Sequence, residues 1–136
     1  MAEKFFMIID DDTDDRIFFK EALNEIFPSA ACLEANGGIE ALQLLQKTEQ
    51  LPDFIFLDIN MPRMDGQECL KELKKVEKLN SIPVIMYSTF FSEESIDEFR
   101  KIGASSYLNK PTDMNKLPEQ ILEAIKKSTD LSIYNK

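Results

Sequence analysis

Short apolar runs alternate with amphipathic segments along the whole of this chain, and the alternation strongly constrains its fold. The expected strands are Phe5–Ile9, Ala30–Ala35, Asp53–Leu57, Val84–Tyr87 and Ser105–Asn109. Runs of this length are typical of buried strands, and the apolar residues between them recur at helical spacing. Strands that alternate with helices form a parallel sheet with right-handed crossovers and helices on both faces. We therefore predict an α/β fold built from five βα units.

The connecting segments carry the signals of helices. Asp14–Phe27 and Gly66–Leu79 have apolar residues at helical spacing. We expect Asn36 to cap a helix whose core face includes Ile39, and Ser92 to cap a later helix. Five βα units favour a (βα)5 doubly wound, flavodoxin-like sheet with strand order 2-1-3-4-5, whose switch point lies between the first and third strands.

Size and charge limit the classes of function. A length of 136 residues favours one domain, which we expect over residues 1–127, with 128–136 as a short tail and no effector domain. The net charge of −9 argues against binding to nucleic acid or anionic membranes. The first apolar run is too short for a secretory signal or a membrane span, so we expect a cytoplasmic protein. With no histidine in the chain, a Ser-His-Asp triad and most zinc sites are excluded.

Polar side chains stand where the expected strands end. Asp10 and Asp11 follow the first strand, Asp58 the third, Ser88 the fourth and Lys110 the fifth. Ligands of open parallel sheets bind outside the carboxyl ends of the strands. The sequence therefore predicts that three acids, a hydroxyl and an ammonium group meet at one edge of the sheet.

This set of groups suits a divalent cation and a phosphoryl group. Two carboxylates about 5 Å apart repel each other by roughly 3 kcal/mol at an effective dielectric constant near 20. Lys110 can offset part of that repulsion, and Mg²⁺, or Mn²⁺, suits an all-oxygen site. A carboxylate can also attack phosphorus to give an acyl phosphate. Asp58, at the end of the central strand, is the best candidate nucleophile, with Ser88 and Lys110 placed to meet phosphoryl oxygens.

These residues resemble the signature of response regulator receiver domains of two-component signalling. The residues that carry the resemblance are Asp10-Asp11, Asp58-Ile59-Asn60-Met61-Pro62-Arg63-Met64-Asp65-Gly66, Ser88 and Lys110-Pro111. They occur in the order and spacing of that family, and the resemblance runs from about Phe5 to about Lys127.

The resemblance implies a role for each position. Asp58 is implied as the phosphoacceptor, while Asp10, Asp11, Asp58 and the backbone carbonyl of Asn60 are implied as metal ligands. Ser88 and Tyr107 are implied as switch residues that respond to phosphorylation. Lys110 is implied to pair with the phosphoryl group, with a cis bond to Pro111.

The resemblance also implies partners. The phosphoryl donor would be a sensor histidine kinase or a histidine phosphotransfer protein. The signal would leave through the surface from Ser92 to the last helix, which includes the fifth strand, toward a downstream protein. We expect a monomer or a weak homodimer, and a phosphoacceptor that assists its own phosphorylation and dephosphorylation rather than an enzyme.

The whole site and some single residues allow other interpretations. An aspartyl-phosphate phosphatase would place its nucleophile on the first strand, an unphosphorylated receiver-like scaffold would keep these residues by accident, and a flavin phosphate would be repelled by the acidic loop. Asp12, Asp14 and Asp15 could tune the affinity for a metal ion, but we interpret them as solvated acids or acids favoured at the start of a helix. We also hypothesise that Phe90, two residues after Ser88, shields an acyl phosphate from water.

Overall fold

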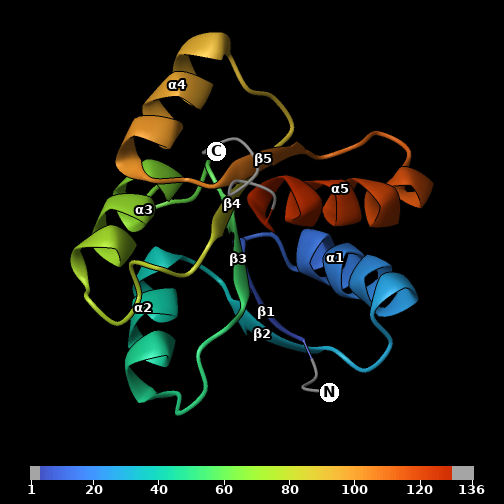
Figure 1. The fold of residues 1–136 in the computed structure, drawn as a ribbon. Helices are drawn as coiled ribbons and strands as arrows, with labels where there is room; N and C mark the ends of the chain where they lie inside the picture. The colour runs from blue at the N-terminus through green and yellow to red at the C-terminus, as the bar shows by residue number, and fades with distance from the viewer. Residues whose placement is uncertain (1–3, 130–136) are drawn as a thin grey trace.

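The computed structural model describes residues 4–129, which form a parallel sheet with helices on both faces (Figure 1). The strands are β1 (Phe5–Ile9), β2 (Ala31–Ala35), β3 (Phe54–Asp58), β4 (Val84–Ser88) and β5 (Ser106–Asn109). Their order is β2-β1-β3-β4-β5, and every neighbouring pair is parallel. The predicted (βα)5 doubly wound, flavodoxin-like fold is therefore confirmed.

The helices are divided between the two faces of the sheet. They are α1 (Thr13–Ile26), α2 (Gly38–Lys47), α3 (Gly66–Lys75), α4 (Glu93–Ile102) and α5 (Leu117–Thr129), the last preceded by a 3-10 turn at Met114–Lys116. Figure 1 shows α1 and α5 on one side of the sheet and α2, α3 and α4 on the other. Among the helices formed by residues 4–129, none has the length and apolar character needed to cross a bilayer.

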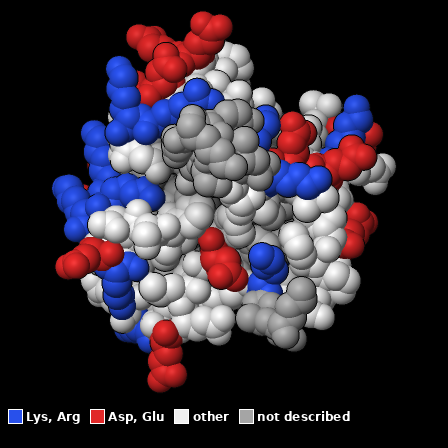
Figure 2. All heavy atoms as spheres, viewed as in Figure 1, with Lys and Arg blue, Asp and Glu red and all other residues white. Residues whose placement is uncertain are grey.

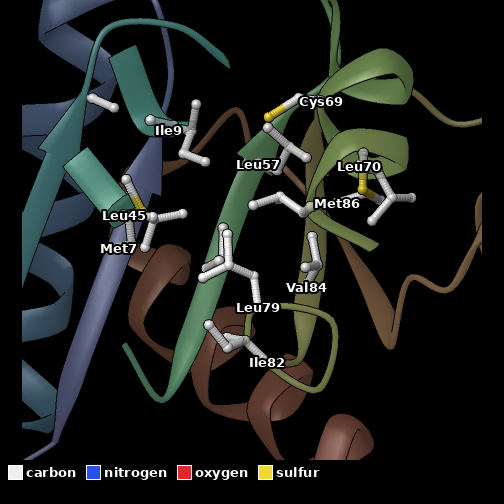
Figure 3. Close-up of a cluster of buried hydrophobic side chains, with 14 of the residues drawn as sticks. Met7, Ile9, Leu45, Leu57, Cys69, Leu70, Leu79, Ile82, Val84 and Met86 are labelled. Atoms are coloured by element: carbon white, nitrogen blue, oxygen red, sulfur yellow. The ribbon is translucent and has the colours of Figure 1, made fainter. Parts of the chain in front are cut away.

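The core has two parts because successive strand side chains point to opposite faces of the sheet. In β3, Ile55 and Leu57 face α2, α3 and α4, whereas Phe54 and Phe56 face α1 and α5. Figure 3 shows the first part, where labelled side chains of β1, β3 and β4 gather with those of α2 and α3. β3 is the middle strand of the sheet, and all five of its residues are buried.

Polar caps fix where the helices begin. The Asp12 side chain accepts hydrogen bonds from the backbone N–H groups of Asp14 and Asp15, and so caps α1. Ser92 caps α4, as predicted, through a reciprocal pair with Ser95. Acidic side chains gather over the outer end of α4 in Figure 2, where its first turn lies, and acids there complement the helix dipole.

The start of α2 differs from the prediction. Gly37, not Asn36, is the N-cap residue, and the backbone N–H of Asn36 donates to Glu40 Oε1 at 2.7 Å. Ile39 is 46% exposed and lies outside the core, whereas Ala41 and Leu45 are fully buried. The buried pair is spaced by one helical turn, which turns the side chain of Ile39 outward.

The C-terminal helix runs beyond residue 127, after which we expected a short tail. Ser128 is buried, and its hydroxyl bonds to the Ala124 carbonyl at 3.0 Å and to Ser106 Oγ at 2.9 Å. The bond to Ser106 joins the last turn of α5 to β5, so the helix continues to Thr129. The rest of the expected tail, residues 130–136, lies outside the described residues.

Candidate metal and phosphoryl site

Three aspartates meet at the carboxyl edge of β1 and β3. The register pairs Ile9 with Leu57, so the next residues, Asp10 and Asp58, stand side by side. Asp10 is fully buried, Asp58 is 6% exposed and Asp11 is exposed. Each of the three offers a carboxylate oxygen, and these oxygens lie within 4.8 Å of one another. The predicted convergence of the three acids is confirmed.

A tight loop leads away from Asp58 into α3. The backbone N–H of Gly66 donates to the Ile59 carbonyl at 2.7 Å, which closes the loop. Arg63, within the loop, has a positive φ of 68°. Asn60 lies in this loop two residues beyond Asp58, and a role of its backbone carbonyl as a metal ligand stays a prediction.

Lys110 reaches the site from the end of β5. Its backbone N–H donates to the Ser88 carbonyl at 2.7 Å, which joins the ends of β4 and β5. Its Nζ donates to Asp15 Oδ2 at 2.8 Å, Asp10 Oδ2 at 3.0 Å and Asp58 Oδ1 at 3.4 Å. The ammonium group also lies 4.7 Å from the centre of the Tyr87 ring. The predicted meeting of the lysine and the acids is confirmed.

The implied cis bond between Lys110 and Pro111 is wrong. Within residues 4–129 the structure has no cis peptide bond. The trans isomer is the intrinsically favoured form of a bond to proline. Lys110 contacts the acids with the bond in this form.

The crowding of charge changes the acidity of the site. Burial, and then the charge of Asp10, raise the pKa of Asp58 to about 7, against the opposing effect of Lys110. Burial also raises the pKa of Asp10. Burial by itself would lower the pKa of Lys110, but hydrogen bonds and charges from its carboxylate partners outweigh it and raise that pKa. The lysine is therefore held as a cation while the acids resist full ionisation.

Ser88 ends β4 beside the backbone of Lys110, and Tyr107 of β5 lies toward α4. Ser88 is 3% exposed at the end of β4, and its Oγ accepts a hydrogen bond from the Phe90 backbone N–H at 3.4 Å. The Tyr107 ring is half-buried, with its centre 5.1 Å from that of Phe91. The roles of Ser88 and Tyr107 as switch residues stay predictions.

Two residues of α1 belong to the site although the sequence did not single them out for it. Asp15 forms an ion pair with Lys110, whereas it was interpreted as an acid placed to suit the helix dipole. Asp15 precedes the buried Phe19 by four residues, which puts both on one face of α1. This four-residue spacing is the sequence signal that indicates which side of α1 carries Asp15. The Arg16 side chain donates a hydrogen bond to the backbone carbonyl of Asp10 at 2.6 Å, and so holds the loop between β1 and α1 in place.

The donor set fits a divalent cation. Two triad carboxylates, those of Asp10 and Asp58, share one lysine with Asp15, and Asp11 adds a further acid, so carboxylates outnumber the ammonium group at this edge. Their oxygens are hard ligands of the kind that Mg²⁺ and Mn²⁺ prefer. The acidic triad is therefore able to hold a divalent metal ion.

A doubly wound sheet with this pocket at its carboxyl edge defines a class of α/β proteins that bind a cation among aspartates. Comparison with known proteins narrows the class. The model of the response regulator receiver domain matches residues 6–122. This chain belongs to that family, which confirms the resemblance found in its sequence.

Similar proteins include both short and long ones. The chain is 31% identical over 127 residues to the sporulation initiation phosphotransferase F of Bacillus subtilis, covering 93% of this chain and 94% of that protein. It is 29% identical to the sensor histidine kinase CheAY of Helicobacter pylori, covering 96% of this chain but only 16% of that protein.

Solved structures agree with the fold. The phosphorylated cyanobacterial phytochrome response regulator RcpA is 28% identical, with a TM-score of 0.82 and 93% of each chain covered. A Mn²⁺-bound form of the response regulator Rcp1 is 25% identical, with a TM-score of 0.77, and the match covers 90% of this chain and 91% of that one.

Proposed function

We propose that this receiver domain accepts a phosphoryl group on Asp58 from a phosphohistidine of a sensor histidine kinase or a histidine phosphotransfer protein. The observation that carries the proposal is the buried Asp58 carboxylate, grouped with those of Asp10 and Asp11 and 3.4 Å from the Lys110 ammonium. The proposal also rests on the similarity to a phosphotransferase that the chain spans over 94% of its length.

The bond changes follow from the chemistry of a carboxylate nucleophile. An oxygen of Asp58 forms a bond to phosphorus, the bond between phosphorus and the donor histidine nitrogen breaks, and that nitrogen takes the electron pair. The product is an acyl phosphate on Asp58. Lys110 and Ser88 are proposed to stabilise the charge on the phosphoryl oxygens, where it is spread in the transition state.

The metal proposed for the site is Mg²⁺, with Mn²⁺ as a substitute. Asp10, Asp11, Asp58 and the Asn60 carbonyl would hold it. When bound, the ion supplies positive charge that neutralises the phosphoryl oxygens and the crowded acids. A structure of a related response regulator with Mn²⁺ supports this choice.

The proposed output is a change in protein contacts. Ser88 would move toward the phosphoryl group, and the face formed by α4, β5 and α5, which includes Tyr107, would repack and bind a downstream protein. Because the chain has a net charge of −9, nucleic acid and anionic membranes are not among the proposed partners. A cytoplasmic location and a monomer or weak homodimer complete the proposal.

Phosphorylation can be tested without knowing the kinase. The protein is incubated with acetyl phosphate and Mg²⁺, and its intact mass is measured. We expect the mass of one phosphoryl group in the wild type and none in Asp58→Asn. The proposal fails if the wild type gains no mass, which would favour an unphosphorylated scaffold, or if the variant gains the same mass, which would put the phosphoryl group on a residue other than Asp58.

A second assay separates the proposal from an aspartyl-phosphate phosphatase. The protein is incubated with a chromogenic phosphate ester in the presence of Mg²⁺. We expect the acyl phosphate to form slowly, without sustained turnover of the ester. Repeated turnover that is lost in Asp58→Asn would make the protein a phosphatase instead.

A further inference from the structure

The Lys110 ammonium lies closest to a carboxylate that is not part of the acidic triad. Its Nζ is 2.8 Å from Asp15, compared with 3.0 Å from Asp10 and 3.4 Å from Asp58. Against the lowering effect of burial, the hydrogen bond to Asp15 is the largest effect that raises the pKa of Lys110. In this structure the lysine is therefore held more closely by Asp15 than by the expected phosphoacceptor.

The position of Asp15 is fixed by the fold rather than by an unconstrained surface loop. Asp12 caps α1 through the backbone N–H groups of Asp14 and Asp15, which sets the first turn of the helix. Asp15 lies on the same helix face as the fully buried Phe19. Asp14 lies on the same face as Phe18, which is 42% exposed, and so points away from the pocket.

All three N–H donors of the Lys110 ammonium group form hydrogen bonds. A lysine ammonium has three N–H donors, and the three carboxylates of Asp10, Asp15 and Asp58 accept one hydrogen bond each. A phosphoryl oxygen can gain a hydrogen bond from Lys110 only if one of these bonds is weakened or lost. The side chain of Asp15 is 30% exposed, while those of Asp10 and Asp58 are 0% and 8% exposed. Water can therefore most easily replace the lysine at Asp15.

We propose that Asp15 is a positioning residue that competes with a phosphoryl group on Asp58 for Lys110. The inference rests on the proposed phosphorylation of Asp58. In the resting protein Asp15 holds the ammonium beside the pocket. When the phosphoryl group arrives, Asp15 gives up its hydrogen bond and Lys110 turns to a phosphoryl oxygen. The competition makes phosphorylation less favourable than it would be without the Asp15 carboxylate.

The rate of phosphorylation tests the direction of this effect. Asp15→Ala and Asp14→Ala are each compared with the wild type in acetyl phosphate and saturating Mg²⁺, and the gain in mass is followed over time. The two variants lose the same charge at adjacent positions, and alanine cannot accept a hydrogen bond from Lys110. Asp15→Ala should be phosphorylated about fivefold faster, the equivalent of one partly exposed ion pair. Asp14→Ala should match the wild type.

Two outcomes of this experiment overturn the inference. Asp15→Ala could be phosphorylated no faster than the wild type, in which case Asp15 does not compete for the lysine. Alternatively, both variants could be faster by the same factor, in which case the effect is one of overall charge. A wild type that gains no phosphoryl mass would instead defeat the proposed function itself, so the two failures are distinguishable.

A second readout does not depend on phosphorylation. In the metal-free protein, the NMR resonance of Lys110 Nζ should shift in Asp15→Ala, because its shortest hydrogen bond is lost. The chemical shift of Lys110 Nζ should be unchanged in Asp14→Ala. An unchanged Lys110 resonance in Asp15→Ala would overturn the inference.

Discussion

Gly66 lies so close to the backbone of Asp58 that no side chain fits between them. A Cβ atom at position 66 would stand 2.5 Å from the Asp58 carbonyl oxygen and 2.7 Å from the Ile59 Cα. The atoms in the way are backbone atoms, which cannot turn aside as a flexible side chain can. The first residue of α3 therefore fixes the end of β3, where the candidate phosphoacceptor stands.

Gly66→Ala should lower the free energy of unfolding by about 2 kcal/mol, because the added methyl group forces the backbone of the loop to shift. Urea denaturation measures the change. Gly37→Ala is the matched control, since nothing lies within 4 Å of a Cβ at that position and its backbone is extended. The control should stay within about 0.5 kcal/mol of the wild type. Equal stability of the two variants would contradict the close approach.

The stability of the metal-free protein should depend on pH through Asp58. The raised pKa means that the folded protein binds this proton more tightly than the unfolded chain, whose value is near 3.8. The stability that Asp58 contributes to the folded protein is therefore present at low pH and is lost as pH rises from about 4 to about 7. Asp58→Asn should be more stable than the wild type at pH 7, by on the order of 2 kcal/mol.

The prediction is checked by the difference in the free energy of unfolding between the wild type and Asp58→Asn, measured at each pH, rather than by the pH dependence of either protein alone. Asp10 has a pKa shifted in the same direction and Glu34 one shifted in the opposite direction, and both remain in the variant. Asp97 is an exposed acid on α4, and Asp97→Asn is the control. Its free energy of unfolding should change with pH as that of the wild type does. If this difference in the free energy of unfolding stayed constant across the pH range, the pKa of the Asp58 carboxyl would not be raised in the folded protein.

Mg²⁺ should stabilise the folded protein. An ion that binds only the folded state adds about 2.7 kcal/mol when its concentration is a hundred times its dissociation constant. The melting temperature should therefore rise with Mg²⁺ in the wild type and respond much less in Asp11→Asn, which lacks one carboxylate of the triad. Removing the ion with a chelator should reverse the rise. An equal response in the variant would exclude Asp11 from the metal site.

Phe90 is expected to control the lifetime of the acyl phosphate. Its side chain is 75% exposed, and its backbone N–H donates to Ser88 Oγ. Phe90→Glu should speed the loss of the phosphoryl group, because a carboxylate brings water where the ring would exclude it. Val76→Glu, an equally drastic change at the exposed end of α3, should leave that rate unchanged. Intact mass followed after removal of the donor measures both rates, and an unchanged rate in Phe90→Glu refutes the shielding hypothesis.

The sequence predicts most of the fold because its signals are local and agree with one another. Each strand is a short apolar run, and parallel strands in this order bring their carboxyl ends together, which placed Asp10, Asp58 and Lys110 at one edge. The start of α2 was mispredicted because Asn36 is a common capping residue, whereas Glu40 satisfies the Asn36 backbone group instead.

Asp15 was overlooked for a related reason. An acid in the first turn of a helix is already accounted for by the helix dipole. Its contact with Lys110 joins residues that are 95 positions apart in the chain. Such a pairing depends on the rotation of α1 against the sheet, which the spacing to Phe19 indicates but which only the folded structure establishes.

The alternation of side chains in β3 and β4 places Asp58 and Ser88 in phase with opposite layers of the core. Asp58 falls in phase with Phe56, whose neighbours belong to α1 and α5. Ser88 falls in phase with Val84 and Met86, which pack with α2, α3 and α4. Asp58 and Ser88 thus belong to opposite layers of the core, although they stand at the same edge of the sheet, and a movement of Ser88 would first reach the layer of α2, α3 and α4.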